Sequence, residues 1–122
     1  PAEIEVQYRE VGTEEELADK VEKVSRVDDT YTTENKLDEI NAEYGNKYEF
    51  VRVDGNENGT YTLEKQTITY WYQKKMAEVE VNYLEVGTDA VLSDQVTKQD
   101  RIDNPYSTEN KLDEINENYE DK

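Results

Sequence analysis

The 122-residue chain contains no cysteine, and its basic residues are scarce. Without cysteine there can be no disulfide, no thiol nucleophile and no thiolate metal site. The 14 Lys and Arg residues stand against 31 Asp and Glu residues, which gives a formal net charge of −17. Such a field repels phosphate backbones and anionic lipid surfaces, so we expect no nucleic-acid partner. No apolar run is long enough to cross a bilayer, and no signal segment is recognisable, so we expect no membrane insertion.

Apolar residues are also few. They make up 34% of the chain against 37% charged residues, a mixture that approaches the composition of disordered proteins. The apolar residues nevertheless fall in strict alternations and in one helical stripe, which indicates small folded units. A unit of this size has only a thin core, close to the lower limit for independent stability.

The most informative feature that is present is an internal repeat. Residues 2–47 align with residues 77–122 at a constant offset of 75 without a gap, and 27 of the 46 pairs are identical. We therefore predict a complete repeat at 1–75 and the N-terminal part of a second at 76–122, as a piece of a longer array. Tandem copies multiply contacts or add length, so we expect a non-catalytic protein rather than an enzyme.

The first copy shows a change of hydrophobic period along its length. We expect strands at 3–9, around Leu17 to Val27, at 48–53, at 60–63 and at 66–73, a helix at 33–44 and a turn at 54–59. Thr32 or Thr33 is the expected N-cap, and Gly45 the expected C-terminal stop. The order β-β-α-β-β-β predicts an α+β fold of the β-grasp (ubiquitin-like) type.

The second copy contains the β-β-α portion and lacks counterparts of residues 48–75. Half of such a fold exposes its core-facing side chains and a sheet edge. We hypothesise that another molecule, in a self-association, or the first copy covers these side chains. They are Tyr83, Leu92, Val96, Leu112 and Ile115. Residues 74–76 alone separate the last strand of copy one from the first strand of copy two, which predicts an elongated tandem.

Three sequence segments carry a family resemblance. They are Tyr31-Thr32-Thr33, then Asp54-Gly55-Asn56-Glu57-Asn58-Gly59-Thr60-Tyr61-Thr62, then Gln66-Thr67-Ile68-Thr69-Tyr70-Trp71-Tyr72-Gln73-Lys74-Lys75. Their order resembles the MucBP (mucin-binding protein) repeat of surface adhesins from Gram-positive bacteria. The resemblance covers all of copy one and the available part of copy two. It implies a tandem, secreted, cell-wall-anchored protein built from β-grasp repeats.

Trp71 is the first candidate for ligand binding. Strand alternation places it opposite Ile68, Tyr70 and Tyr72, on the face that also carries Thr67 and Thr69. An exposed indole can stack on the apolar face of a sugar while hydroxyls and amides bind its polar rim. The alternative is that this second face is covered and Trp71 packs there.

Tyr61, beside the turn, is expected to extend the surface that Trp71 offers. Most of the other tyrosines lie on predicted inner faces, each with its hydroxyl at the edge of the core. They are Tyr8, Tyr44, Tyr48, Tyr70 and Tyr72.

Two acidic segments have a chemical interpretation that we weigh against simpler ones. Asp54, Asn56 and Asn58 match the first half of a calcium loop, but position twelve is Lys65, where a bidentate Glu is needed. A β-turn explains the same residues, so we expect no cofactor, with calcium as the alternative. The run Glu14-Glu15-Glu16 offers carboxylates for glycoside cleavage, but a solvated surface run is the expected interpretation.

Two functional hypotheses remain. The first is an adhesin repeat that binds host mucin or other glycoprotein glycans weakly per copy and gains strength from neighbouring repeats of the same chain. The second is a stalk that projects another adhesive domain from the cell wall. Mucin is acidic and so is this chain, so long-range attraction cannot drive contact, and binding must use stacking and hydrogen bonds or a bridging cation.

Overall fold

The structure is a computed structural model that describes residues 1–120. The chain divides into two compact units, Pro1–Lys75 (unit 1) and a second that begins at Met76 (unit 2), and each is described by itself. Positions 121–122, the end of the predicted second copy, lie outside the described residues.

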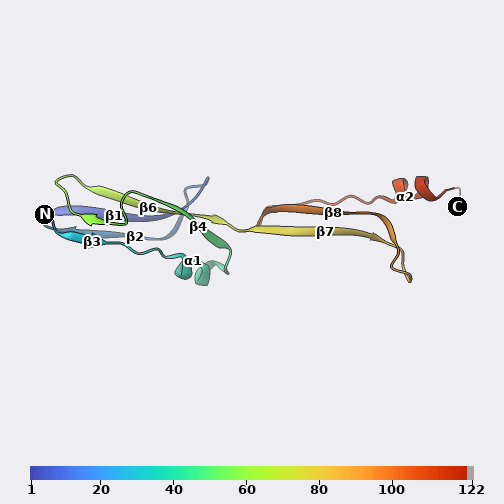
Figure 1. The fold of residues 1–122 in the computed structure, drawn as a ribbon, viewed down its shortest axis with the longest axis horizontal. Coiled ribbons are helices and arrows are strands. Elements are labelled where there is room, and N and C mark those ends of the chain that lie inside the picture. The colour runs from blue at the N-terminus through green and yellow to red at the C-terminus, as the bar shows by residue number, and fades with distance from the viewer. Residues whose placement is uncertain (121–122) are drawn as a thin grey trace. The chain divides into compact units, whose positions relative to one another are not determined.

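Strands dominate both units (Figure 1). Unit 1 contains β1 (Ala2–Glu10), β2 (Glu16–Ser25), β3 (Thr30–Thr32), α1 (Leu37–Tyr44), β4 (Tyr48–Asp54), β5 (Asn58–Thr60) and β6 (Gln66–Lys74). Unit 2 contains β7 (Met76–Leu84), β8 (Val91–Arg101) and α2 (Leu112–Tyr119). The predicted α+β class is confirmed.

The main sheet of unit 1 has four strands in the order β2-β1-β6-β4. The two central strands, β1 and β6, run parallel, whereas β2 and β4 pair with them in antiparallel fashion at the edges. A parallel pair needs a long crossover, and the segment from β2 through α1 to β4 supplies it. This order is compatible with a β-grasp, which stays a prediction.

The core lies between the main sheet and the helix, which sits to one side of the strands in Figure 1. Alternate residues of the two central strands point into it, as the period-two pattern predicted. The buried apolar residues of these strands are Ala2, Ile4, Val6, Tyr8, Ile68, Tyr70 and Tyr72. Leu17 extends the core along the sheet from β2, and Ile40 from α1 closes it on the helix side.

Tyrosine hydroxyls hold the segment that leads into the helix. The Tyr8 hydroxyl donates to the Glu34 carbonyl at 2.8 Å, and the Tyr72 hydroxyl donates to Asn35 Oδ1 at 2.8 Å. The Tyr70 hydroxyl lies 2.6 Å from the Thr33 hydroxyl. Each hydroxyl therefore has a partner at the edge of the core, as a buried tyrosine requires.

These contacts correct the predicted start of the helix. The helix begins at Leu37 rather than at residue 33, and neither Thr32 nor Thr33 caps it. Thr32 belongs to β3, while the Thr33 hydroxyl bonds the Glu57 carbonyl and Tyr70. The first helical N–H is instead bonded by Asn35 Oδ1 at 3.0 Å. The predicted stop at Gly45 is confirmed, since this residue is left-handed with φ 80°.

The second correction concerns the short strand after the turn. It was predicted at 60–63 and lies at Asn58–Thr60, where it pairs with an unpredicted strand, Thr30–Thr32. The pairing uses residues far apart in sequence, so no local pattern marks it. Unit 1 therefore has one more strand than the predicted order.

Unit 2 repeats the first half of unit 1. Its two strands form an antiparallel hairpin, and its helix again follows an extended segment. No described residue of unit 2 is buried, and the apolar side chains predicted to need a cover are at least partly exposed. They are Tyr83, Leu92, Val96, Ile115 and, at 57% exposure, Leu112. What covers them stays a prediction.

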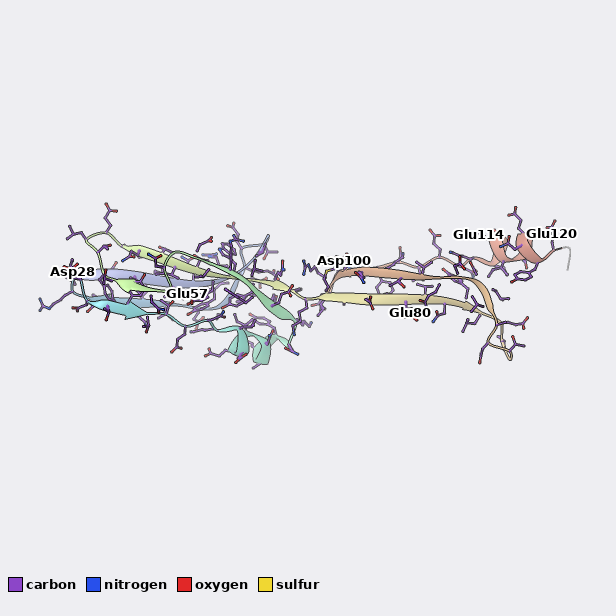
Figure 2. The ribbon with its side chains drawn as sticks, in the orientation of Figure 1. Asp28, Glu57, Glu80, Asp100, Glu114 and Glu120 are labelled. Carbon is purple, nitrogen blue, oxygen red and sulfur yellow. The ribbon has the colours of Figure 1, made fainter. Side chains whose placement is uncertain are left out.

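Acidic side chains are spread over the surface of both units. Those labelled in Figure 2 are Asp28, Glu57, Glu80, Asp100, Glu114 and Glu120, and all are exposed. No helix among the described residues has the length and apolar character needed to cross a membrane.

We predict that the protein unfolds at alkaline pH in a step controlled by its buried tyrosines. Burial raises the pKa of Tyr8 from 10.0 to about 12 and raises the pKa of Tyr48 and Tyr72 further. A raised pKa favours the neutral phenol in the folded state, so this stability is complete below pH 10 and declines as the pH rises through about 12. The melting temperature should fall over that window, together with a rise in tyrosinate absorbance. Full ionisation of all tyrosines near pH 10 without unfolding would contradict the prediction.

Candidate functional site

The face of the main sheet that lies opposite the helix is open and polar. Parallel pairing sets Glu5 beside Thr67, Gln7 beside Thr69 and Arg9 beside Trp71. These β6 residues lie on the face opposite the core, as strand alternation predicted; Thr67 is exposed, and Thr69 and Trp71 are partly exposed. We call this surface the outer face and define it by eight residues: Glu5, Gln7, Arg9, Arg52, Asp54, Thr67, Thr69 and Trp71.

A β-bulge brings two of these residues to the outer face. The register between β4 and β6 shifts between Phe50 and Arg52, so that Phe50 pairs with Tyr72 and Arg52 with Trp71. Without the extra residue, strict alternation from the buried Tyr48 would turn Arg52 inward. The bulge therefore places the Arg52 and Asp54 side chains beside the indole. No sequence signal marked it.

The Trp71 side chain is held by two neighbours. Its Nε1–H donates to Asp54 Oδ2 at 3.0 Å, and the Arg52 guanidinium lies 5.3 Å from the ring centroid. Arg52 Nε in turn bonds Asp54 Oδ1 at 3.2 Å. Asp54 therefore holds the N–H edge of the indole, and Arg52 covers one face of its ring. The sequence predicted the face of the sheet on which the indole lies but not that a cation covers it.

A second polar row runs along β1. Gln7 donates to Glu5, and Arg9 donates through Nε to Gln7 at 2.7 Å and through Nη1 to the Glu14 carbonyl at 2.8 Å. Lys65 and Lys20 approach the Glu5 carboxylate at 3.2 Å and 3.7 Å. The hydrogen bond from Gln7, followed by that from Lys65, lowers the pKa of Glu5. This row bounds a small hollow of about 170 Å³.

Tyr61 does not join this surface, which corrects the sequence-based expectation. It is 4% exposed and packs edge-on against Tyr31, with the ring centroids 5.7 Å apart. Its backbone N–H bonds the Asp29 carbonyl, and its carbonyl accepts from Asp28 N–H, both at 2.8 Å. These bonds tie the residue after β5 to the loop before β3 and turn its side chain into the core.

The residues of the calcium alternative already have protein partners. Asp54 uses both carboxylate oxygens on Trp71 and Arg52. The Asn56 carbonyl accepts from the Tyr31 hydroxyl at 2.7 Å, and Asn58 pairs with Thr32 in the small sheet. Within residues 1–120, no group of three or more acidic, His or Cys side chains is arranged to hold a metal. The calcium alternative remains untested.

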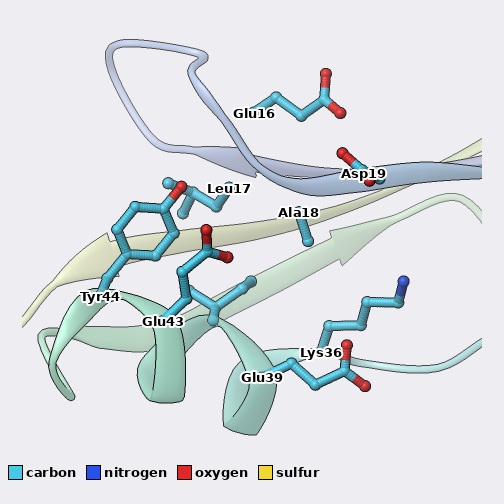
Figure 3. Close-up of a pocket in the computed structure, with 9 residues that line it drawn as sticks. Glu16, Leu17, Ala18, Asp19, Lys36, Glu39, Glu43 and Tyr44 are labelled. Carbon is cyan, nitrogen blue, oxygen red and sulfur yellow. The ribbon is translucent and has the colours of Figure 1, made fainter.

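A larger hollow lies elsewhere, between β2 and α1 (Figure 3). It has a volume of about 630 Å³ and an apolar base of Leu17 and Ile40. Its polar lining consists of Glu16, Asp19, Glu39, Glu43 and a single cation, Lys36. Four carboxylates against one ammonium make this groove unfavourable for an acidic ligand. Glu14, Glu15 and Glu16 are exposed, as expected of a solvated run.

The architecture places the chain in a general class of proteins. A thin α+β unit with one covered and one open polar sheet face, followed by a partial copy of itself, is a tandem-repeat α+β protein. The family model described as "MucBP domain" matches residues 3–73. The chain belongs to the MucBP family.

Solved structures share the fold at low sequence identity. The type 2 repeat of the mucus binding protein MUB from Lactobacillus reuteri matches with a TM-score of 0.52 and 14% identity. A second structure, Mub-RV, matches with a TM-score of 0.51 and 15% identity. Each match covers 81% of this chain but only 64% and 60% of the respective structures. No curated protein matches the chain.

We predict that Asp54→Ala releases Trp71 without unfolding the protein. The chain has one tryptophan, so its fluorescence reports on this site alone. Loss of the acceptor should shift the emission and increase quenching by acrylamide, while the free energy of unfolding changes by no more than about 1 kcal/mol because the ion pair is exposed. Asp38→Ala, at an exposed position of α1, is the matched control and should leave the emission unchanged. Identical quenching in both variants would show that Asp54 does not hold the indole.

We also predict that calcium leaves the protein unaffected. An ion at the 54–59 turn would have to displace both contacts of Asp54. The melting temperature should therefore stay constant on addition of millimolar calcium, with magnesium as the comparison. A rise specific to calcium that disappears in Asn56→Ala would establish a site there.

Proposed function

We propose that unit 1 is a mucus-binding repeat of an extracellular bacterial adhesin and that it contacts glycan through the outer face. The observation that carries the proposal is the partly exposed Trp71, oriented by Asp54 and surrounded by hydroxyl, amide and guanidinium groups. Membership of the MucBP family and the likeness to a repeat of a mucus binding protein support it.

The chemistry of the outer face suits a sugar better than a peptide. An indole stacks on the apolar face of a pyranose, and Thr69 and Thr67 lie two and four residues before Trp71 on the same side of β6. Arg52 lies over the indole, but an exposed cation–π contact is worth only about 0.5–1 kcal/mol. A ligand can displace it at small cost, and the freed guanidinium can then donate to the ligand.

Local charge also favours this face. Although the chain carries −17 overall, the outer face and its margin hold the cations Arg9, Arg52, Lys20 and Lys65 beside the carboxylates of Glu5 and Asp54. These cations offer short-range partners to the carboxylates and sulfates of acidic mucin glycans. The groove between β2 and α1, with its four carboxylates, offers the reverse.

Membership of the family supports a proposal for the partner, the setting and the valency. We propose that the repeat acts outside the cell, on a protein anchored to the wall of a Gram-positive bacterium, without catalysis and without a cofactor. Contact through one shallow face is weak, so affinity would come from many copies on one chain. The alternative is a stalk repeat, and the specific observation in its favour is that Lys75 alone separates β6 from β7.

We predict that the chain binds immobilised mucin weakly and that binding rises steeply when two copies are fused. Trp71→Ala should weaken binding about three- to tenfold, the effect of losing one aromatic stacking contact. Leu63→Ala, which removes a side chain that is 89% exposed, should bind as the wild type does.

Two results would reject parts of this proposal. Equal binding by the Trp71 variant and the wild type would remove the outer face as the site. The absence of binding by both the single and the fused chain would favour the stalk. Circular dichroism of each variant establishes that it is folded.

A further inference from the structure

A row of four side chains crosses the outer face from strand to strand. Register pairs Arg52 of β4 with Trp71 of β6. It pairs Trp71 in turn with Arg9 of β1, and Arg9 with Glu16 of β2. We call these four residues the transverse row. Neighbouring strands lie about 4.8 Å apart, so the row spans about 14 Å across the sheet. A ligand that lies across the strands therefore contacts its members in turn.

A hollow adjoins this row over β1 and β2. It has a volume of about 170 Å³, and we call it the edge hollow. Arg9 belongs both to its lining and to the transverse row, so the hollow begins where the row leaves the indole. Figure 3 shows the Glu16 carboxylate on the side of β2 away from α1, in agreement with the pairing of Glu16 with Arg9. The residues that line the hollow are Glu5, Gln7, Arg9, Glu16 and Lys20.

Extra residues in β2 explain the position of the hollow. From the pair Val6–Val21 to the pair Arg9–Glu16, β1 advances by three residues and β2 by five. Inserted residues bend a strand and increase its local twist. The residues that β2 contributes to the hollow, Glu16 and Lys20, lie within this irregular stretch. The hollow is therefore a product of the strand register.

The lining of the edge hollow carries no net charge. Glu5 and Glu16 are acidic, Arg9 and Lys20 are basic, and Gln7 is neutral. A hydroxyl group both donates and accepts hydrogen bonds, so a ligand with many hydroxyls needs acceptors and donors side by side. A neutral sugar therefore matches this lining better than a ligand of one charge sign does.

Donors and acceptors of the hollow are available to such a ligand. Arg9 uses two of its five N–H donors, on Gln7 and on the Glu14 carbonyl, and these bonds hold the guanidinium in place. Glu16 is exposed, and the Lys20 side chain is 56% exposed. A guanidinium that is already oriented loses little entropy when it binds a further group.

The second copy retains the irregular register without the charged pair. At the offset of 75, the counterparts of Arg9 and Glu16 are Leu84 and Val91. These two residues pair with each other beyond register shifts at the equivalent positions. They are 49% and 64% exposed. The charges of Arg9 and Glu16 are therefore not needed to form the hairpin.

We propose that the outer face binds a glycan through at least two adjacent sugar residues and that the sugar in the edge hollow is neutral. One sugar stacks on the Trp71 indole, a step that rests on the proposed function of this face. The next sugar lies over β1 and β2, where Arg9 donates to its hydroxyls and Glu16 accepts from them. A single sugar cannot contact both ends of a row of about 14 Å, so the oligosaccharide binds more tightly than its component sugars.

The experiment uses oligosaccharides released from mucin and separated by anion exchange into a neutral and an acidic pool. Each pool is added to the isotope-labelled chain, and the amide and indole N–H signals are followed. The neutral pool should shift the Trp71 indole signal together with the signals of residues 7–9 and 16–20. Galactose, the single-sugar comparison, should bind about tenfold more weakly, because it makes one of the two sets of contacts.

Arg9→Leu combined with Glu16→Val introduces the side chains that the second copy carries at these positions. This double variant should bind the neutral pool about tenfold more weakly, because charge-assisted hydrogen bonds are lost. At saturation, its Trp71 indole signal should still shift. Arg26→Leu combined with Asp38→Ala is the matched control, since it also removes one cation and one anion at exposed positions, and it should bind as the wild type does.

Two results would overturn the proposal and leave the proposed function standing. The first is equal binding of the neutral pool by the Arg9/Glu16 variant and the wild type, while Trp71→Ala still weakens binding. The second is a shift of the signals of residues 16–20 with the acidic pool alone. If neither pool shifts any signal and whole mucin does not bind, the proposed function itself is rejected, and the two-sugar site with it. Circular dichroism establishes that each variant is folded.

Discussion

The fold depends on hydrogen bonds from core tyrosines to the segment before the helix. The chain has one phenylalanine and ten tyrosines, so large side chains in its core bring hydroxyl groups with them. A buried hydroxyl without a partner is costly, and no buried side-chain polar atom among the described residues lacks one. Tyr8, Tyr70 and Tyr72 find their partners within residues 33–36. That stretch is therefore extended, and the helix is short.

A short helix can cover only one side of a four-stranded sheet. Unit 1 commits its inner face to the core, so alternation leaves every second residue of β1 and β6 on the outer face. The bulge in β4 then adds Arg52 and Asp54 beside Trp71. A thin protein of this kind has no room for a deep pocket, and its recognition surface is one sheet face. Weak contact at each copy and repetition along the chain are two consequences of the same small core.

The sequence predicted the elements that depend on local alternation. The first and last strands of unit 1, the burial of Ile68, Tyr70 and Tyr72, and the position of Trp71 on the opposite face all follow from period two. The wrong predictions concern residues whose conformation is set by contacts with residues distant in the sequence. Thr33 bonds Tyr70 instead of capping the helix, and Tyr61 is turned inward by Asp28 and Asp29. The bulge reverses which side chains of β4 point to the core beyond Val51. The alternation of residue types along the sequence does not reveal an inserted residue of this kind.

The two units separate local from long-range contributions to the fold. Their aligned residues are identical at 27 of 46 positions, and the three last strands of unit 1 have no counterpart among the described residues of unit 2. The hydroxyl contact of Tyr8 is retained by Tyr83 in unit 2, so this contact needs only the first half of the repeat. Burial is not retained: Leu37 packs against the core of unit 1, whereas its counterpart Leu112 is 57% exposed. The first half therefore sets the geometry, and β4 to β6 supply most of the apolar burial that stabilises it. A hairpin and a single helix bury too little surface to be stable alone, so the stability of unit 1 depends on the strands that follow its helix.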